Sequence, residues 1–387
     1  HIKKNMILIL ILILYILIWI LIDRRILQQS KMDSCRWRVN QGPELKVYYP
    51  TDKPSINAFL LRPESISHIC RCLKIPCMLF RLLLSHRIGA TTTKPSPLMH
   101  NKFKLFPVIL FSTGIKGTTD MYAHLALQFV QAGYIFMVIE HEAGDTCYSK
   151  DAIGNFIQYI NPPDNAKNPT DAVQYRDIQL KPNHNAFYKR LTNIKTFRQP
   201  FLRKRVQEIR FATTALSQHD VLSTTQSNQT IQDMLNHMDT QHLIIMGHSM
   251  GGASVVTAVH EMPPHTYRAC ILFDPFLFIC ETTINLYNTP CVLFLSNNWT
   301  GNINASFVHR LVYANKVFSA CIPGARHLFV GDPPFWFPYW FGVVLGFVGH
   351  MDPGVILKAI INQIHVFIQH DKWEHCKNIS KDVVWNY

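Results

Sequence analysis

Patterns that read nucleic acid are absent from this sequence, although the chain is strongly basic. Its 38 Lys and Arg residues outnumber 25 Asp and Glu residues, which gives a formal net charge of +13. The excess is spread over the chain, with mild concentrations before residue 105 and over residues 189–210. We find no basic helix with interleaved aromatic residues, no zinc-finger spacing and no helix-turn-helix pattern. We therefore expect no nucleic-acid partner. A membrane surface or an anionic lipid is the better candidate for a partner of the positive charge. The alternative is that the charge serves only solubility.

Paired Cys-x2-Cys spacings, which structural zinc sites use, are also lacking among the ten cysteines. The one cluster is Cys70-x-Cys72-x4-Cys77, and most other cysteines lie in or beside apolar runs, where cysteine behaves as a small hydrophobic residue. The sequence therefore predicts no metal site and no cofactor. It assigns no disulfide pairing, although a lumenal chain could form disulfides.

Internal repeats are missing, and no domain boundary is visible after residue 40. With 387 residues, of which 48% are hydrophobic, the chain can bury one large core. We therefore predict a single domain over residues 41–387, preceded by a linker over residues 26–40.

Small residues, which a signal-peptidase cleavage site needs, are missing at the end of the first apolar run. This run, Met6 to Ile22, holds 17 residues, almost all Ile and Leu, which is the short end of what a membrane-spanning helix requires. Lys3 and Lys4 precede it, and Asp23-Arg24-Arg25 follows. We therefore favour an uncleaved signal-anchor or transmembrane helix over residues 1–25, with a cleaved signal peptide as the alternative.

The predicted location follows from this anchor. Basic residues on both sides leave its orientation open. Four Asn-x-Ser/Thr sequons permit a lumenal or extracellular domain without establishing one; they lie at Asn228, Asn298, Asn304 and Asn378. We expect a single-pass membrane protein whose domain over residues 41–387 is lumenal or extracellular, and secreted if the first segment is removed.

Continuous apolar runs alternate with helical patterns through the rest of the chain. Residues 106–111 and 134–139 are such runs, separated by a helical pattern over residues 121–132, which is the arrangement of a parallel strand–helix–strand unit. Similar runs follow at residues 269–273, 291–295 and 316–322. The pattern predicts an α/β fold with a mainly parallel central sheet and helices on both faces.

A Gly-x-Ser-x-Gly motif lies between another apolar run and a helical stretch, in residues 243–254. Gly247 and Gly251 flank Ser249, as in a strained strand-to-helix turn that exposes a nucleophile. Met250 would begin the helix, so its free N–H could stabilise an oxyanion. The alternative is a glycine-rich turn with an ordinary solvated serine.

Partners for this serine follow in the order acid, then histidine. Asp274 ends the next buried strand, and His327 lies in a loop after the last predicted strand. Both belong to the edge of a parallel sheet at which ligands bind. A capping role for Asp274 and a surface location for His327 are the structural alternatives. Ile115, behind Gly114 in the loop after residues 106–111, is the candidate for the second oxyanion donor.

Several stretches together resemble the plasma-type platelet-activating-factor acetylhydrolases, also called lipoprotein-associated phospholipases, of the α/β-hydrolase superfamily. The likeness covers about residues 40 to 375, with long gaps near 60–100 and 145–200. It is carried by GPELKVYYP, by the strand–loop–helix–strand of residues 106–145, by GHSMGGASV, by ACILFDPFLF and by GARHLFVGDPPFWF.

The resemblance implies Ser249 as nucleophile, Asp274 as acid, His327 as base, and Ile115 and Met250 as oxyanion donors. It implies a calcium-independent serine esterase that cleaves the short or oxidised sn-2 acyl group from glycerophospholipids. The oxyanion loop has Thr113-Gly114 where the family usually has His-Gly, and Met250 replaces an aromatic residue. A backbone donor tolerates both changes, but they alter the acyl pocket.

Two other functions stay open: a general lipase or carboxylesterase for other acyl substrates, and a catalytically inactive hydrolase-fold binding protein. The oligomeric state is not predicted. Residues 335–348 (FWFPYWFGVVLGFV) are unusually apolar and aromatic. We interpret them as a lipid-docking segment beside the site, with a core helix and its loop as the alternative.

Overall fold

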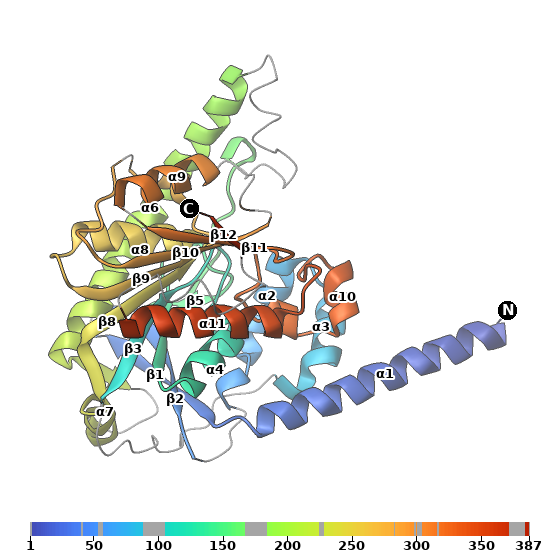
Figure 1. Cartoon of the computed structure of the whole chain (residues 1–387). Helices are drawn as coiled ribbons and strands as arrows, with labels where there is room; N and C mark the ends of the chain where they lie inside the picture. Colours follow the sequence, from blue (N-terminus) through green and yellow to red (C-terminus); the bar gives the residue numbers. More distant parts are fainter. Residues whose placement is uncertain are drawn as a thin grey trace.

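The computed structural model describes residues 2–39, 42–52, 57–87, 105–166, 184–223, 228–281, 283–297, 299, 304–315, 317–370 and 384–386. Within these residues one large sheet has the strand order β12-β11-β10-β9-β8-β3-β4-β2-β1-β7 (Figure 1). Its strands are β1 Met32–Val39, β2 Glu44–Pro50, β3 Phe106–Ser112, β4 Ile135–Glu140, β7 Val221–Ser223, β8 Met238–His248, β9 Tyr267–Phe273, β10 Cys291–Ser296, β11 Phe318–Ile322 and β12 Val384–Asn386. A separate hairpin joins β5 Ser149–Lys150 to β6 Phe156–Ile157.

The centre of the sheet is parallel, from β11 through β10, β9, β8 and β3 to β4. The outer strands are antiparallel: β2 pairs with β4, β1 pairs with β2 and β7, and β12 pairs with β11. The predicted α/β fold is confirmed, with a mixed sheet that is parallel at its centre and antiparallel at its outer strands. Strand β1 lies within the stretch 26–40 that the sequence predicts to be a linker.

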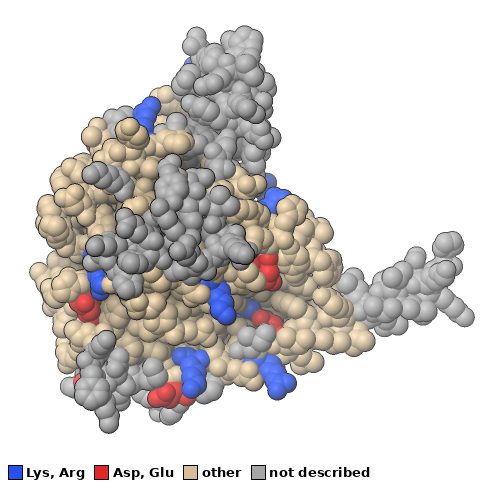
Figure 2. Space-filling view, viewed as in Figure 1, with Lys and Arg blue, Asp and Glu red and all other residues tan. Residues whose placement is uncertain are grey.

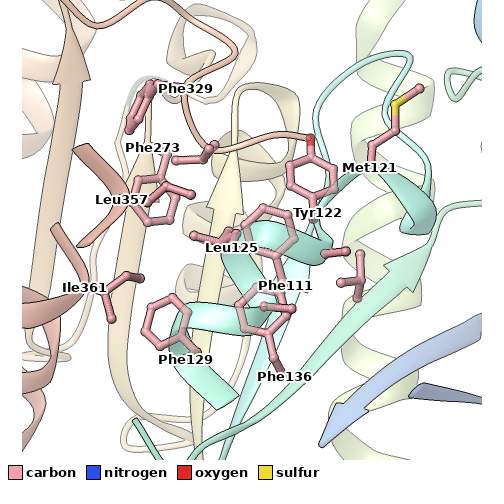
Figure 3. Close-up of a cluster of buried hydrophobic side chains, with 14 of the residues drawn as sticks. Phe111, Met121, Tyr122, Leu125, Phe129, Phe136, Phe273, Phe329, Leu357 and Ile361 are labelled. Carbon is pink, nitrogen blue, oxygen red and sulfur yellow. The ribbon is translucent and has the colours of Figure 1, made fainter. Parts of the chain in front are cut away.

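Helices cover both faces of the sheet, because the side chains of each strand alternate between two cores. In β3, Ile109 and Phe111 join one core, and Val108 and Leu110 join the other. Figure 3 shows part of the first core, with Phe111 among aromatic side chains. The first core is covered by α2 Ile66–Leu73, α3 Cys77–Leu84, α4 Ala123–Gln131, α10 Tyr339–Val344 and α11 Pro353–His370. The second is covered by α6 His184–Gln218, α7 Asn228–Leu235, α8 Met250–Glu261 and α9 Asn304–Asn315.

The predicted transmembrane helix is wrong, and so is the single-pass membrane location that depended on it. Helix α1 does form, over Ile2–Gln28. Among the described residues, however, no helix is both long enough and apolar enough to cross a membrane. In the described part of α1, Ile16 and Trp19 pack against the first core, and Asp23 pairs with Arg87 at 2.6 Å. The apolar run therefore contacts the domain through Ile16 and Trp19, whereas Leu21 and Ile22 at its end are exposed (Figure 1).

The segment over residues 335–348 is divided between core and surface. Trp336 and Phe337 are buried, whereas Tyr339 and Trp340 on α10 are each 43% exposed. The buried residues fit the alternative of a core helix with its loop, and the exposed aromatic residues fit a lipid-docking segment. Lipid docking stays a prediction.

On the face shown in Figure 2, the described Lys and Arg side chains lie apart from one another and form no continuous stripe.

Candidate active site

Ser249 occupies a strained corner between β8 and α8. Its backbone has φ 56° and ψ −119°, a left-handed conformation that only a rigid surrounding structure maintains in a non-glycine residue. The Ser249 N–H donates to the Phe273 carbonyl oxygen at 2.9 Å, which ties the corner to the end of β9. A Cβ at Gly251 would lie 2.0 Å from the Ser112 carbonyl oxygen, and one at Gly247 would lie 2.4 Å from the Gly251 carbonyl oxygen. Both glycines are therefore required by close backbone packing.

Asp274 follows β9 directly and holds a fully buried carboxylate. One oxygen accepts the Ser296 N–H at 2.7 Å, and the other accepts the Ser296 hydroxyl at 2.5 Å. The second oxygen also lies 3.0 Å from Nδ1 of His327. Three donors satisfy this buried charge, and one of them is the predicted catalytic base.

Two aromatic rings lie against His327. Trp299 stacks on it with centroids 4.2 Å apart and 4° between the planes, and His248 lies 4.7 Å away on a tilted plane. The His327 side chain stays 31% exposed, so a substrate could reach it. Although Ser249 and His327 are both described, no hydrogen bond joins the serine hydroxyl to the ring. Such catalytic bonds are often long before substrate binds.

A short hydrogen-bond chain connects the oxyanion loop, the nucleophile corner and the histidine loop. The Tyr122 hydroxyl accepts the Gly114 N–H at 3.1 Å and lies 3.1 Å from Nδ1 of His248. Nε2 of His248 lies 2.8 Å from the His327 carbonyl oxygen. Burial lowers the pKa of His248 well below its usual value, so the ring is neutral. Nδ1 of His248 then accepts the hydrogen of the Tyr122 hydroxyl, and its Nε2–H donates to the His327 carbonyl oxygen. These bonds fix the oxyanion loop, the nucleophile corner and the histidine loop relative to one another. Figure 3 shows the Tyr122 ring on the core.

The loop that carries Ile115 is held from behind by a buried arginine. Arg205 on α6 donates to the carbonyl oxygens of Thr113 and Gly114, the latter at 3.3 Å, and pairs with Asp145 at 2.9 Å. Because a trans peptide points its C=O and N–H in opposite directions, the Ile115 N–H is directed away from Arg205. Within the described part of the chain, no group accepts it. Met250 begins α8, so its N–H has no acceptor inside the helix.

A second buried polar pair, His141 and Glu208, lies near Arg205. Nε2 of His141 lies 2.7 Å from the Ser112 hydroxyl, and Nδ1 of His141 lies 2.7 Å from the Glu208 carboxyl group. Burial raises the pKa of Glu208 to about 8 and lowers the pKa of His141 well below its usual range. The pair therefore carries no net charge at neutral pH, with the proton on Glu208 bonded to His141.

This protonated glutamate makes stability depend on pH. In the unfolded chain Glu208 loses its proton near pH 4.5, whereas in the folded protein it keeps it until about pH 8. Its stabilising contribution is therefore complete below pH 4.5 and lost as pH rises through 8. His141 has the opposite effect, but only below about pH 6.5. From pH 6.5 to 8 we expect Glu208 alone to lower the free energy of unfolding by about 2 kcal/mol.

Denaturant unfolding at pH 6.5 and 8 of the native protein and of Glu208→Gln tests this. The glutamine amide can donate to His141 while its oxygen accepts the Glu142 N–H, as protonated Glu208 does. We expect the variant to be as stable as the native protein at pH 6.5 and not to lose this 2 kcal/mol at pH 8. Equal pH dependence in both proteins would contradict a protonated Glu208.

The chain is similar to known proteins over most of its length, including the sheet and the candidate site. A model of the family described as platelet-activating factor acetylhydrolase, isoform II, matches residues 32–384. The chain belongs to this family. Within the family, platelet-activating factor acetylhydrolase of Canis lupus familiaris is 24% identical over 67% of this chain, and that of Cavia porcellus is 26% identical over 85%. The chain spans 55% of the dog protein and 72% of the guinea-pig protein.

Solved structures show the fold. A ferulic acid esterase from Streptomyces cinnamoneus superposes with a TM-score of 0.56 at 14% identity, covering 93% of this chain and 97% of that protein. The family assignment is thus confirmed, and so is the α/β-hydrolase-like sheet with helices on both faces, but not the transmembrane helix that the sequence predicts before it.

In this family member the predicted site residues come from the expected strand ends. Asp274 and His327 are hydrogen-bonded, and the Ser249 corner is tied to the same edge through Phe273 and His248. The catalytic roles of these residues stay predictions. Within the described residues, no group of three or more His, Cys, Asp or Glu side chains could hold a metal ion. A cavity of about 550 Å³ beside η6 (Leu277–Ile279) and α9 includes none of the predicted site residues.

Sequence reasoning missed the residues that hold the site together: Tyr122, Arg205, His248, Ser296 and Trp299. His248 and Ser296 carried a signal, because one lies inside the Gly-x-Ser-x-Gly motif and the other ends a strand at the same sheet edge. Arg205 bonds backbone carbonyls, which any residue supplies, so no sequence pattern indicates its partner.

Proposed function

We propose that this protein is a serine esterase that hydrolyses the short or oxidised sn-2 acyl ester of glycerophospholipids. The observation that carries the proposal is the strained Ser249 corner at the sheet edge where the buried Asp274 carboxylate binds His327. Membership of the acetylhydrolase family supports the substrate class, because its curated relatives are named platelet-activating factor acetylhydrolases.

The proposed mechanism assigns one step to each residue. His327 takes the proton of the Ser249 hydroxyl as that oxygen attacks the ester carbonyl, and it returns the proton to the leaving alcohol. Asp274 keeps the proton of the ring on Nδ1, so that Nε2 is the free base. The N–H groups of Ile115 and Met250 stabilise the negative oxygen of the tetrahedral intermediate. Water then hydrolyses the acyl-enzyme by the same route.

A general lipase or carboxylesterase is the second candidate, because Thr113 and Met250 lie where the acyl pocket begins and differ from the usual family residues. The same Ser249 chemistry serves both candidates, so only the acyl chain distinguishes them.

Two measurements on the full chain test the proposal. A fluorophosphonate probe should label the native protein, because it reacts with activated serines; an unlabelled protein would refute the enzyme and favour an inactive binding protein. Comparing kcat/KM for phospholipids with sn-2 acetyl and sn-2 long acyl chains tests the substrate. We expect a preference for acetyl of at least tenfold, and equal rates would favour the general lipase.

A further inference from the structure

A small polar cavity lies beside the oxyanion loop, outside the residues that the mechanism uses. It has a volume of about 80 Å³, and a single water needs roughly 10–15 Å³ on this measure. Three of the residues that line it carry basic side chains: His68 and Arg71 from α2, and Lys116 from the oxyanion loop. Its other walls include Cys147 and Tyr159, and none of the described lining residues is acidic.

Among the described residues, no carboxylate pairs with the cations that line this cavity. Arg36, Arg87 and Arg205, which are buried elsewhere, each pair with a carboxylate. Arg71, which is exposed, and Lys116, which is half-buried, form no ion pair with any carboxylate that the structure describes, and the Lys116 amino group lies over the Tyr159 ring, 5.5 Å from its centroid. Unpaired cations that converge on one cavity favour an anion there.

Arg198 on α6 adds a third cation, which is hydrogen-bonded to Tyr159 and pairs with no carboxylate among the described residues. It is only 2% exposed, and its guanidinium lies against the rings of Phe197 and Phe201. Its Nε and Nη1 atoms have no hydrogen-bond partner among the described residues. Burial raises the pKa of the Tyr159 hydroxyl, and the adjacent Arg198 opposes that rise. A buried guanidinium without a carboxylate is costly, and an anion in the neighbouring cavity would offset the cost.

The cavity is also close to the predicted point of attack. Lys116 directly follows Ile115, the predicted oxyanion donor, and its N–H is fixed by the Asp145 carbonyl oxygen at 2.8 Å. A Cβ on Gly114 would lie 3.2 Å from the Cβ of Ser249. In a glycerophospholipid the phosphate is only a few bonds from the sn-2 ester, so a substrate could reach both places at once.

We propose that this cavity binds the phosphate of the phospholipid headgroup, with Arg71 and Lys116 as its principal ligands. The inference rests on the proposed function and names the part of the substrate that fixes its position. Bound in this way, the phosphate places the sn-2 ester at Ser249, so the contacts favour phospholipids over neutral esters of the same acid.

The test compares two acetyl esters, 1-alkyl-2-acetylglycerophosphocholine and p-nitrophenyl acetate, on the full chain. Arg71→Met and Lys116→Met should each lower kcat/KM for the phospholipid about tenfold and change that for the neutral ester less than about twofold. Arg71→Lys should restore part of the loss. Arg203→Met is the matched control, because Arg203 is exposed and pairs with Glu261 away from the cavity; it should change neither rate.

Competition by inorganic phosphate distinguishes binding of the phospholipid headgroup from binding of a free phosphate ion. We expect it to compete with the phospholipid, but not with the neutral ester, and to compete less in Arg71→Met. An unchanged ratio of the two esters in both variants would overturn the inference, and phosphate competition with that unchanged ratio would assign the cavity to free phosphate. A native protein that hydrolyses neither ester and resists the fluorophosphonate probe would overturn the proposed function as well.

Discussion

Replacing Ser249 with alanine should lower kcat for acetyl esters by about a millionfold, to the rate left by binding and the oxyanion donors alone. No other hydroxyl of the corner can take its place, because the other residues between Gly247 and Gly251 are His248 and Met250. The backbone at φ 56° is held by the Ser249 N–H bond to Phe273 and by the Phe276 N–H bond to the Ser249 carbonyl oxygen, and alanine keeps both. The variant should therefore fold normally, and fluorophosphonate labelling should disappear with the activity.

Ser217→Ala provides the control, since its hydroxyl makes a local bond to the Thr214 carbonyl oxygen at the exposed end of α6. It should retain full turnover. Ser249→Gly should be as inactive as Ser249→Ala but melt at a higher temperature, because glycine adopts a positive φ without strain. A labelled and active Ser249→Ala protein would show that the nucleophile lies elsewhere.

The parts of the fold that the sequence predicts are those whose signal is local. The strands at residues 106–111, 134–139, 269–273 and 291–295 are continuous apolar runs, because a central parallel strand is buried on both sides. Their carboxyl ends lie at one edge, so a sequence that places Ser249, Asp274 and His327 at strand ends also predicts that they meet.

The parts that it does not predict depend on distant contacts. Strands β7 and β12 have three residues each, and β1 owes its place to its pairing with β2 and β7, so nothing local distinguishes them from loops. The transmembrane prediction at α1 is wrong because hydropathy counts apolar residues without showing what they contact. Two of these residues, Ile16 and Trp19, contact the core. The hydrogen bond from Arg205 to the Thr113 carbonyl oxygen joins residues that are 92 positions apart, through a backbone atom that every residue has.

Replacing Asp274 with asparagine should lower kcat about ten-thousandfold while the protein stays folded. In the native site the oxygen that faces His327 also accepts the Ser296 hydroxyl. An asparagine NH2 group at that position donates to Nδ1 of His327, so the ring proton moves to Nε2 and the base that should receive the serine proton is lost. The flipped amide would present its oxygen to His327, but it would direct its NH2 group at the Ser296 N–H, which is also a donor, so this orientation is disfavoured.

Asp332→Asn is the matched control, because Asp332 is also buried and also lies beside a histidine, His124, at 3.1 Å. Asp332 accepts the backbone N–H groups of Ala123 and His124 at the start of α4. Its replacement should cost about 1 kcal/mol of stability and change kcat only a few-fold. Single-turnover rates and thermal melting of both variants separate the two effects. If Asp332→Asn lost as much activity as Asp274→Asn, the carboxylates would act through stability alone, and the assignment of Asp274 to His327 would fail.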